Sequence, residues 1–237
     1  MKTVTTAPDC DDCDVRSDSV FADLPMVVID VINTGKQCKH YQKGDIIINE
    51  GTYPSHLMCI HQGKIKLQKL GTDGREQIIS LVKQGDIMGY RALLSGETYY
   101  TSAIALEDST VCSIPKESFF NVVRSNSRLA FDMMQLLSTE LRESQMKVVE
   151  MAQKSVKERL AEGLLVLYQT YGLQNDKKTL AVTLSREELA TMIGTATETV
   201  IRLLAEFKRQ KFVEIRGRNI KILNYNGLDT DIQRKNS

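Results

Sequence analysis

Short apolar runs alternate with polar, glycine-containing turns over much of the first half of the chain. Between residues 36 and 115 these runs are rich in Ile, Val and Leu, and the turns fall at Gly44, Gly51, Gly63, Gly74, Gly85 and Gly96. Short strands separated by regular turns are typical of an all-β roll or barrel. Gln62-Gly63 and Asp73-Gly74 are the clearest predicted hairpin turns, because glycine adopts the positive φ that tight turns require.

After Pro115 the hydrophobic pattern becomes helical. Apolar and small residues recur at alternating spacings of four and three, at Ala130, Met134, Leu137, Leu141, Ser144, Val148 and Met151. This narrow stripe is the seam pattern of a coiled coil, and no charged residue interrupts it. We therefore expect a dimerisation helix whose seam is formed by Met134, Leu137, Leu141 and Val148. The alternative is an amphipathic helix that packs on its own domain.

The segment from Ser185 to Arg218 has the pattern of two short helices, a tight turn and a basic hairpin. Gly194 lies where the turn requires a left-handed residue, four residues after Ala190 and six before Val200. Two capping boxes frame the turn, Ser185 with Glu188 and Thr195 with Glu198. The pattern predicts a winged helix-turn-helix, which places its second helix in the DNA major groove.

The elements in order predict an α+β protein with an N-terminal cupin-like β-roll, a long dimerisation helix and a C-terminal winged helix-turn-helix. A further helix is expected from Leu160 to Tyr171, followed by a polar loop to Lys178. The expected domains are an acidic arm (1–22), the β-roll sensor (23–127), the dimerisation helix (128–153), the DNA-binding domain (154–229) and a polar tail (230–237).

A formal net charge of +1 conceals an uneven distribution. Residues 1–23 hold six acidic side chains against two basic ones, whereas the segment from Arg202 to Lys221 holds seven basic side chains against two acidic ones. The basic C-terminal end suits DNA phosphates. Judged by charge alone, these basic residues could equally form a solvent-exposed helix face that binds no DNA.

The location expected from the sequence is the cytoplasm, without membrane association. The chain opens without the apolar core of a signal peptide, and it lacks a run of about 18 apolar residues that could span a membrane. Its five cysteines are an odd number. In that setting the sequence predicts free thiols rather than a disulfide framework.

Several motifs resemble the CRP/FNR family of bacterial transcription regulators. They are Lys43-Gly44-Asp45, Glu50-Gly51, the run from Gly85 to Gly89, and the run from Thr197 to Arg202. The segment from Ala105 to Pro115 is most similar to the FNR side of the family. The resemblance covers nearly the whole chain. It implies a homodimeric regulator that binds double-stranded DNA at a pseudopalindromic site and contacts RNA polymerase.

Glu198 and Arg202 are four residues apart and therefore project from one face of the second helix. Arginine donates two hydrogen bonds to guanine, and glutamate accepts one from cytosine. Thr197 stands where the cAMP-binding branch has a second base-reading arginine, and Ile201 offers an apolar contact to thymine. The alternatives are a capping role for Glu198, and a phosphate contact or an intrahelical salt bridge for Arg202.

A second set of residues is expected to contact the DNA backbone. It comprises Ser185, Arg186, Thr195, Thr199, Lys208, Arg209, Arg216, Arg218 and Lys221. The alternative function is a β-roll ligand-binding module that acts on a protein partner, which the basic wing argues against. An enzyme is not expected, because His40, His56 and His61 are spread over separate predicted strands and read as ordinary structural residues.

The resemblance places an effector pocket at Gly89, Tyr90, Arg91, Tyr100, Thr101 and Ser102. Relatives that bind cyclic nucleotides neutralise the cyclic phosphate with an arginine, but the corresponding segment here, Tyr100-Thr101-Ser102, contains none. A buried phosphate without a cation is costly. We therefore expect regulation by another small molecule or by a redox signal, and not by cAMP.

The FNR side also includes regulators in which N-terminal cysteines and one distant cysteine hold an iron–sulfur cluster. The matching residues here are Cys10, Cys13 and Cys112, but the third N-terminal position falls on Ser19. Cys38 or a nearby aspartate would have to complete the set. The sequence therefore favours ordinary thiols, with Cys59 and Cys112 buried, over an assembled cluster.

Overall fold

The computed structural model describes residues 9–228, so the predicted tail at 230–237 lies outside the described residues. The chain divides into two compact units. The first contains the residues up to Leu141 apart from 70–78, and the second contains 70–78 together with the residues from Arg142 onward. None of the helices within the described residues is long and apolar enough to cross a membrane.

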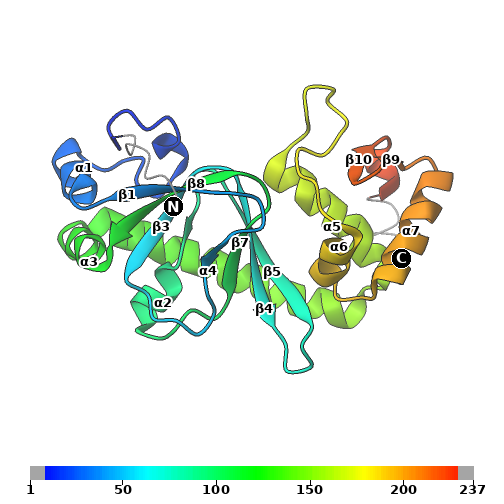
Figure 1. The fold of residues 1–237 in the computed structure, drawn as a ribbon, viewed down its shortest axis with the longest axis horizontal. Coiled ribbons are helices and arrows are strands. Elements are labelled where there is room, and N and C mark those ends of the chain that lie inside the picture. The colour runs from blue at the N-terminus through cyan, green and yellow to red at the C-terminus, as the bar shows by residue number, and fades with distance from the viewer. Residues whose placement is uncertain (1–8, 229–237) are drawn as a thin grey trace. The chain divides into compact units, whose positions relative to one another are not determined.

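The first unit is built around a β-roll of two four-stranded sheets (Figure 1). One sheet has the order β1-β8-β3-β6, from β1 (Gln37–Tyr41), β8 (Ser109–Pro115), β3 (His56–Gln62) and β6 (Ile87–Met88). The other has the order β2-β7-β4-β5, from β2 (Ile46–Ile48), β7 (Ser102–Ala105), β4 (Lys64–Leu70) and β5 (Glu76–Lys83). The roll that the turn spacing predicts is therefore confirmed.

Among the described residues, alternating side chains divide the apolar core of the roll between two clusters. Ile60, Ile65 and Ala103 belong to the cluster between the two sheets. The second cluster joins Leu57 of β3 to three helices, α1 (Met26–Asn33), α3 (Lys116–Ser125) and the start of α4 (Ser127–Gln153). Leu57 and Ile60 are in different clusters because successive strand residues face opposite sides of a sheet. A short helix, α2 (Tyr90–Ser95), follows β6.

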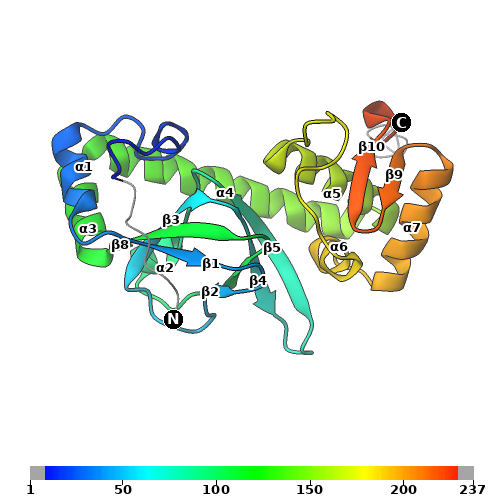
Figure 2. The same ribbon diagram turned by 45° about the horizontal axis from the view of Figure 1, so that its top comes forward.

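The second unit contains three packed helices and a two-stranded wing (Figure 2). These elements are α5 (Val156–Tyr171), α6 (Arg186–Ile193), α7 (Thr197–Arg209), β9 (Val213–Arg216) and β10 (Asn219–Ile222). The first of these helices starts earlier than Leu160, where the sequence pattern places its beginning. A capping box formed by Ser155 and Glu158 begins it at Val156.

The structure confirms one predicted hairpin turn and corrects the other. Asp73-Gly74 connects β4 to β5, which are neighbours in one sheet. Gln62-Gly63 connects β3 to β4, which belong to different sheets, so it forms a corner of the roll and not a hairpin. Gly63 has φ +109°, and a Cβ there would lie 2.1 Å from the Oγ of Ser109. Close approach of two chain segments therefore requires glycine at this corner.

Replacement of Gly63 by alanine is expected to destabilise the roll by about 2–4 kcal/mol, because steric overlap with Ser109 adds to the strain of positive φ. Gly44→Ala is the matched control. Gly44 also has positive φ, but a Cβ there would meet no atom within 4 Å, so only the strain of about 1–2 kcal/mol applies. Urea denaturation followed by circular dichroism measures both. Equal losses would contradict the assignment of a crowded corner.

Candidate DNA-binding helix pair and cysteine pocket

The first helix of the pair is fixed at both ends as the sequence predicts. Ser185 Oγ accepts a hydrogen bond from the Glu188 N–H at 3.0 Å, and the Glu188 carboxylate accepts one from the Ser185 N–H at 2.8 Å. The helix ends at Gly194, which is left-handed with φ 67°. The start of α6 is therefore satisfied by its own capping box, and Gly194 supplies the left-handed residue at its end.

The second predicted capping box is wrong. Helix α7 begins at Thr197 with Ala196 as its N-cap, and no side chain caps it. The Thr195–Glu198 spacing fits the motif, but the cap position lies one residue later, so the Thr195 hydroxyl is not at the helix end. The Glu198 carboxylate is exposed and is not used as a cap.

Helix α7 has two chemically distinct faces. Val200, Leu203, Leu204 and Phe207 are buried against the rest of the unit. Glu198, Ile201 and Arg202 are exposed, and Thr197 is half-buried. The four residues predicted to read bases therefore lie on or beside the face that the unit leaves open.

Some of the residues predicted to contact the DNA backbone are exposed, whereas others make contacts inside the unit. Lys208, Arg209, Arg216 and Arg218 are exposed at the end of α7 and in the wing, while Thr195 and Thr199 are half-buried. Arg186 donates to the Gly217 carbonyl at 2.9 Å, and Arg216 Nε lies 2.6 Å from Glu214. The Ser185 hydroxyl is part of the α6 cap.

Lys221 is engaged within the unit by Asp176. Its Nζ lies 3.2 Å from the Asp176 carboxylate. Hydrogen bonds from Thr179 hold the pKa of Asp176 below its usual range. The Lys178 N–H and the Lys221 ammonium lower it further, by smaller amounts. The carboxylate therefore stays charged at neutral pH and competes with phosphate for this lysine.

Arg159, which no sequence motif singles out, holds the turn of the helix pair. Its guanidinium donates to the carbonyls of Ile193 at 3.0 Å and Gly194 at 3.3 Å, at the end of α6. It also donates to Met151 and Lys154, at the end of α4. No local pattern signals this role, because the carbonyls come from segments before and after the arginine.

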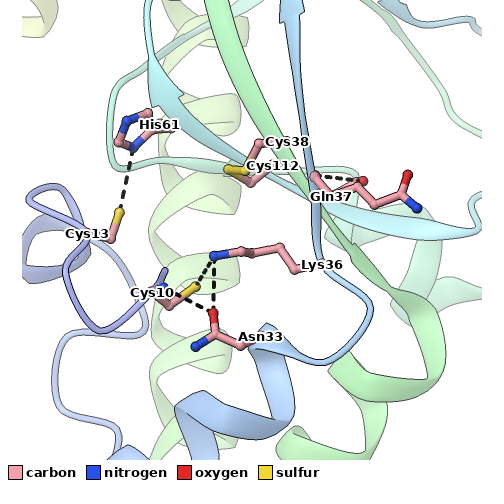
Figure 3. Close-up of a disulfide and its surroundings, with 9 residues drawn as sticks. Cys10, Cys13, Asn33, Lys36, Gln37, Cys38, His61 and Cys112 are labelled. Atoms are coloured by element: carbon pink, nitrogen blue, oxygen red, sulfur yellow. Dashed lines mark hydrogen bonds between the residues drawn. A yellow bond between two sulfur atoms is a disulfide. The ribbon is translucent and has the colours of Figure 1, made fainter. Parts of the chain in front are cut away.

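Three cysteines form a row across the β1-β8-β3 sheet. Cys112 on β8 is in register with Cys38 on β1 and with Cys59 on β3. Cys38 and Cys112 are joined by a disulfide (Figure 3). This corrects the expectation of free thiols throughout. An odd number of cysteines does not exclude a single disulfide, and it cannot reveal that strand pairing brings together two cysteines 74 residues apart in the sequence.

The N-terminal cysteines face the same region as this row. Cys10, Cys13, Cys59 and Cys112 line one pocket together with Lys36 and His61. Lys36 Nζ donates to Cys10 Sγ at 3.0 Å (Figure 3). Burial raises the pKa of the Cys59 thiol, and neighbouring Cys10 raises it further. Cys59 and His61, read from the sequence as structural residues, thus belong to the pocket.

The pocket does not fit a four-cysteine iron–sulfur cluster in this state. Such a cluster requires four thiolates. The free cysteines among the described residues are Cys10, Cys13 and Cys59, whereas Cys112, the predicted distant ligand, is bonded to Cys38. Cys38 cannot substitute for the same reason.

The residues predicted to form an effector pocket contact other parts of the first unit. Arg91 Nε lies 3.4 Å from the Glu140 carboxylate on α4. The pKa of Tyr90 is raised, first by burial of its hydroxyl and then by the same Glu140 carboxylate. Gly89 has φ +85°, and a Cβ there would lie 3.1 Å from the Tyr99 ring. Ser102 Oγ accepts from the Glu50 N–H at 3.0 Å. None of the six lines the cysteine pocket.

Replacing Ser185 by alanine is expected to lower the free energy of unfolding by about 1 kcal/mol, because α6 loses its cap. Thr195→Ala, at the box that does not form, is expected to change it by less than about 0.5 kcal/mol. Thermal unfolding of the two variants separates these cases. If Thr195→Ala lowered the free energy of unfolding as much as Ser185→Ala does, the conclusion that Thr195 caps no helix would be contradicted.

Reducing the disulfide is expected to destabilise the roll by about 2–4 kcal/mol, because the bond closes a long loop in the unfolded chain. Denaturation with and without dithiothreitol measures this. The C38S/C112S variant should be insensitive to the reductant, whereas C59S, which keeps the disulfide, should remain sensitive. A wild-type protein indifferent to dithiothreitol would show that the bond is not formed.

Comparison with family models and known proteins agrees with this arrangement. Residues 38–126 match the model of the cyclic nucleotide-binding domain, and residues 158–230 match the Crp-like helix-turn-helix domain. The fumarate and nitrate reduction regulatory protein of Vibrio cholerae is 28% identical over 218 residues, covering 91% of this chain and 87% of that protein. Electron transport regulator A of Shewanella oneidensis is 29% identical over 192 residues, covering 81% and 76%.

Solved structures share the fold. FixK2 from Bradyrhizobium japonicum superposes with a TM-score of 0.74 at 24% identity, covering 82% of this chain and 96% of that one. A CRP/FNR family transcriptional regulator from Thermus thermophilus gives 0.70 at 24% identity, covering 83% and 98%. With its β-roll, long helix and Crp-like helix-turn-helix, this chain belongs to the CRP/FNR family of DNA-binding transcription regulators.

Proposed function

We propose that the protein acts as a homodimer that reads a pseudopalindromic DNA site with α7 of each protomer. The observation that carries this proposal is the division of α7 into a buried apolar face and an exposed face with Glu198, Ile201 and Arg202. A helix held in this way inserts into the major groove without losing its packing.

The exposed seam of α4 supports the dimer. The exposed fraction is 56% for Met134, 61% for Leu141 and 69% for Val148. Leu137, the fourth predicted seam residue, packs partly against the apolar cluster of its own roll. Three apolar side chains on one stripe are typical of a helix that pairs with a second copy. Two-fold symmetry then sets the half-sites about one helical turn apart.

In this scheme the residues of α7 divide the reading of one half-site. Arg202 donates to a guanine, Glu198 accepts from a cytosine, and Ile201 contacts a thymine methyl group. Thr197 cannot make the bidentate contact of an arginine, so the half-site lacks a second arginine–guanine pair. Lys208, Arg209, Arg216 and Arg218 hold phosphates, since their side chains are exposed.

The β-roll supplies the regulatory input, and we propose a redox signal instead of cAMP. No arginine stands at Tyr100-Thr101-Ser102, and Arg91 is paired with Glu140. A disulfide beside three free thiols offers a reversible two-electron change. A dithiol reductant would supply two electrons and two protons, and would itself become a disulfide, as Cys38 and Cys112 become thiols. RNA polymerase is the proposed partner of the DNA-bound dimer.

The base-reading role is tested with DNA selected by the wild-type protein from a randomised duplex pool. Arg202→Ala should lose about 1–3 kcal/mol on the selected site and relax specificity at one base pair. Arg218→Ala is the control, because this exposed wing residue should weaken binding to all sequences and reduce the salt slope by about one. Equal losses for Arg202→Ala on selected and random DNA would refute the assignment, and a monomer that ignores duplex DNA at low salt would refute the function.

A further inference from the structure

A cysteine, an aspartate and a histidine converge where the N-terminal arm meets β3. The ligand atoms of Cys13, Asp14 and His61 all lie within 4.8 Å of one another. Cys13 and Asp14 belong to the arm, whereas His61 is on β3, so segments nearly fifty residues apart provide the group. Figure 3 shows the Cys13 sulfur and the His61 ring directed toward each other.

The spacing of the Cys13 sulfur and the His61 nitrogen matches that of two ligands on one metal ion. Cys13 Sγ and His61 Nδ1 are 3.7 Å apart. With zinc–sulfur bonds of about 2.3 Å and zinc–nitrogen bonds of about 2.0 Å, two ligands at a tetrahedral angle are separated by about 3.5 Å. A metal ion between the two atoms would therefore require only a small movement of either side chain.

The chemistry of the donors selects the class of ion. Thiolate and imidazole suit zinc and ferrous iron, whereas magnesium and calcium require oxygen ligands. Asp14 is exposed, while Cys13 and His61 are half-buried. Three protein ligands on a partly open site leave a fourth position for water or another group.

We propose that Cys13, Asp14 and His61 bind one divalent transition-metal ion of the zinc or ferrous type, which fastens the N-terminal arm to the β-roll. The site uses neither Cys112 nor Cys38, so it is compatible with the disulfide that withdraws Cys112 from a cluster. Metal binding displaces a proton from the thiol, so affinity rises with pH.

Titration of the chelator-treated full-length protein with Co²⁺ tests the proposal, because thiolate-bound tetrahedral cobalt has characteristic charge-transfer and d–d absorption. One equivalent should bind, and Cys13→Ser, Asp14→Asn and His61→Ala should each weaken binding by at least about tenfold. The matched controls are His40→Ala and Asp12→Asn, which remove an exposed histidine of the roll and an exposed aspartate of the arm, both outside the group. Both should bind as wild type does.

The C38S/C112S variant separates this site from a cluster of the kind the sequence resemblance implies. Retained binding of one Co²⁺ supports the proposal, because the proposed ligands are intact. Zn²⁺ should also raise the melting temperature of the wild-type protein but not of His61→Ala, since ligands stabilise the state that binds them. Loss of binding in C38S/C112S, several irons with acid-labile sulfide in the wild-type protein, or a Cys13–His61 pair that binds no metal would each overturn it.

Discussion

One guanidinium, that of Arg159, joins the end of α4 to the turn of the helix-turn-helix. Helix C-termini leave carbonyls without partners, and Arg159 supplies donors to two such ends, those of α4 and α6. Each charged hydrogen bond of this kind contributes about 1.5–3 kcal/mol. The turn after α6 passes through Gly194, whose carbonyl is one of the acceptors. The turn leads into α7, whose orientation also depends on the burial of Val200, Leu203 and Phe207 on its other face.

The features that could be predicted from the sequence are those whose causes are local. The Ser185–Glu188 box and the left-handed Gly194 need only neighbouring residues, and both occur in the structure. Predictions from neighbouring residues fail where the backbone has an alternative start for a helix, or where a distant segment packs against a turn. Thr195 has the spacing of a cap, but the backbone starts α7 after Ala196. Gly63 has the composition of a hairpin turn, but tertiary packing against Ser109 makes it a corner between sheets.

The cysteine pocket shows the same limit more strongly. Its members come from positions 10, 13, 59 and 112, and only strand register brings Cys59 and Cys112 side by side. Register depends on which strands pair, and spacing along the chain does not reveal it. The sequence identifies Cys10, Cys13 and Cys112 through family resemblance, but Cys59 and His61 carry no motif. Cys38, the disulfide partner, is expected from the sequence only as a substitute ligand, because its alignment with Cys112 depends on the pairing of β1 with β8.

Helix α4 gives the two units a covalent connection that contacts functional residues in each. Within the first unit Glu140 pairs with Arg91, one of the residues expected to line the effector pocket. Within the second unit the carbonyl of Met151 accepts from Arg159, which also holds the turn before α7. These two points on α4 are eleven residues apart, or about 16 Å along a continuous helix. Helix α4 therefore carries, in one unbroken stretch of backbone, a partner of Arg91 in the first unit and a partner of Arg159 in the second.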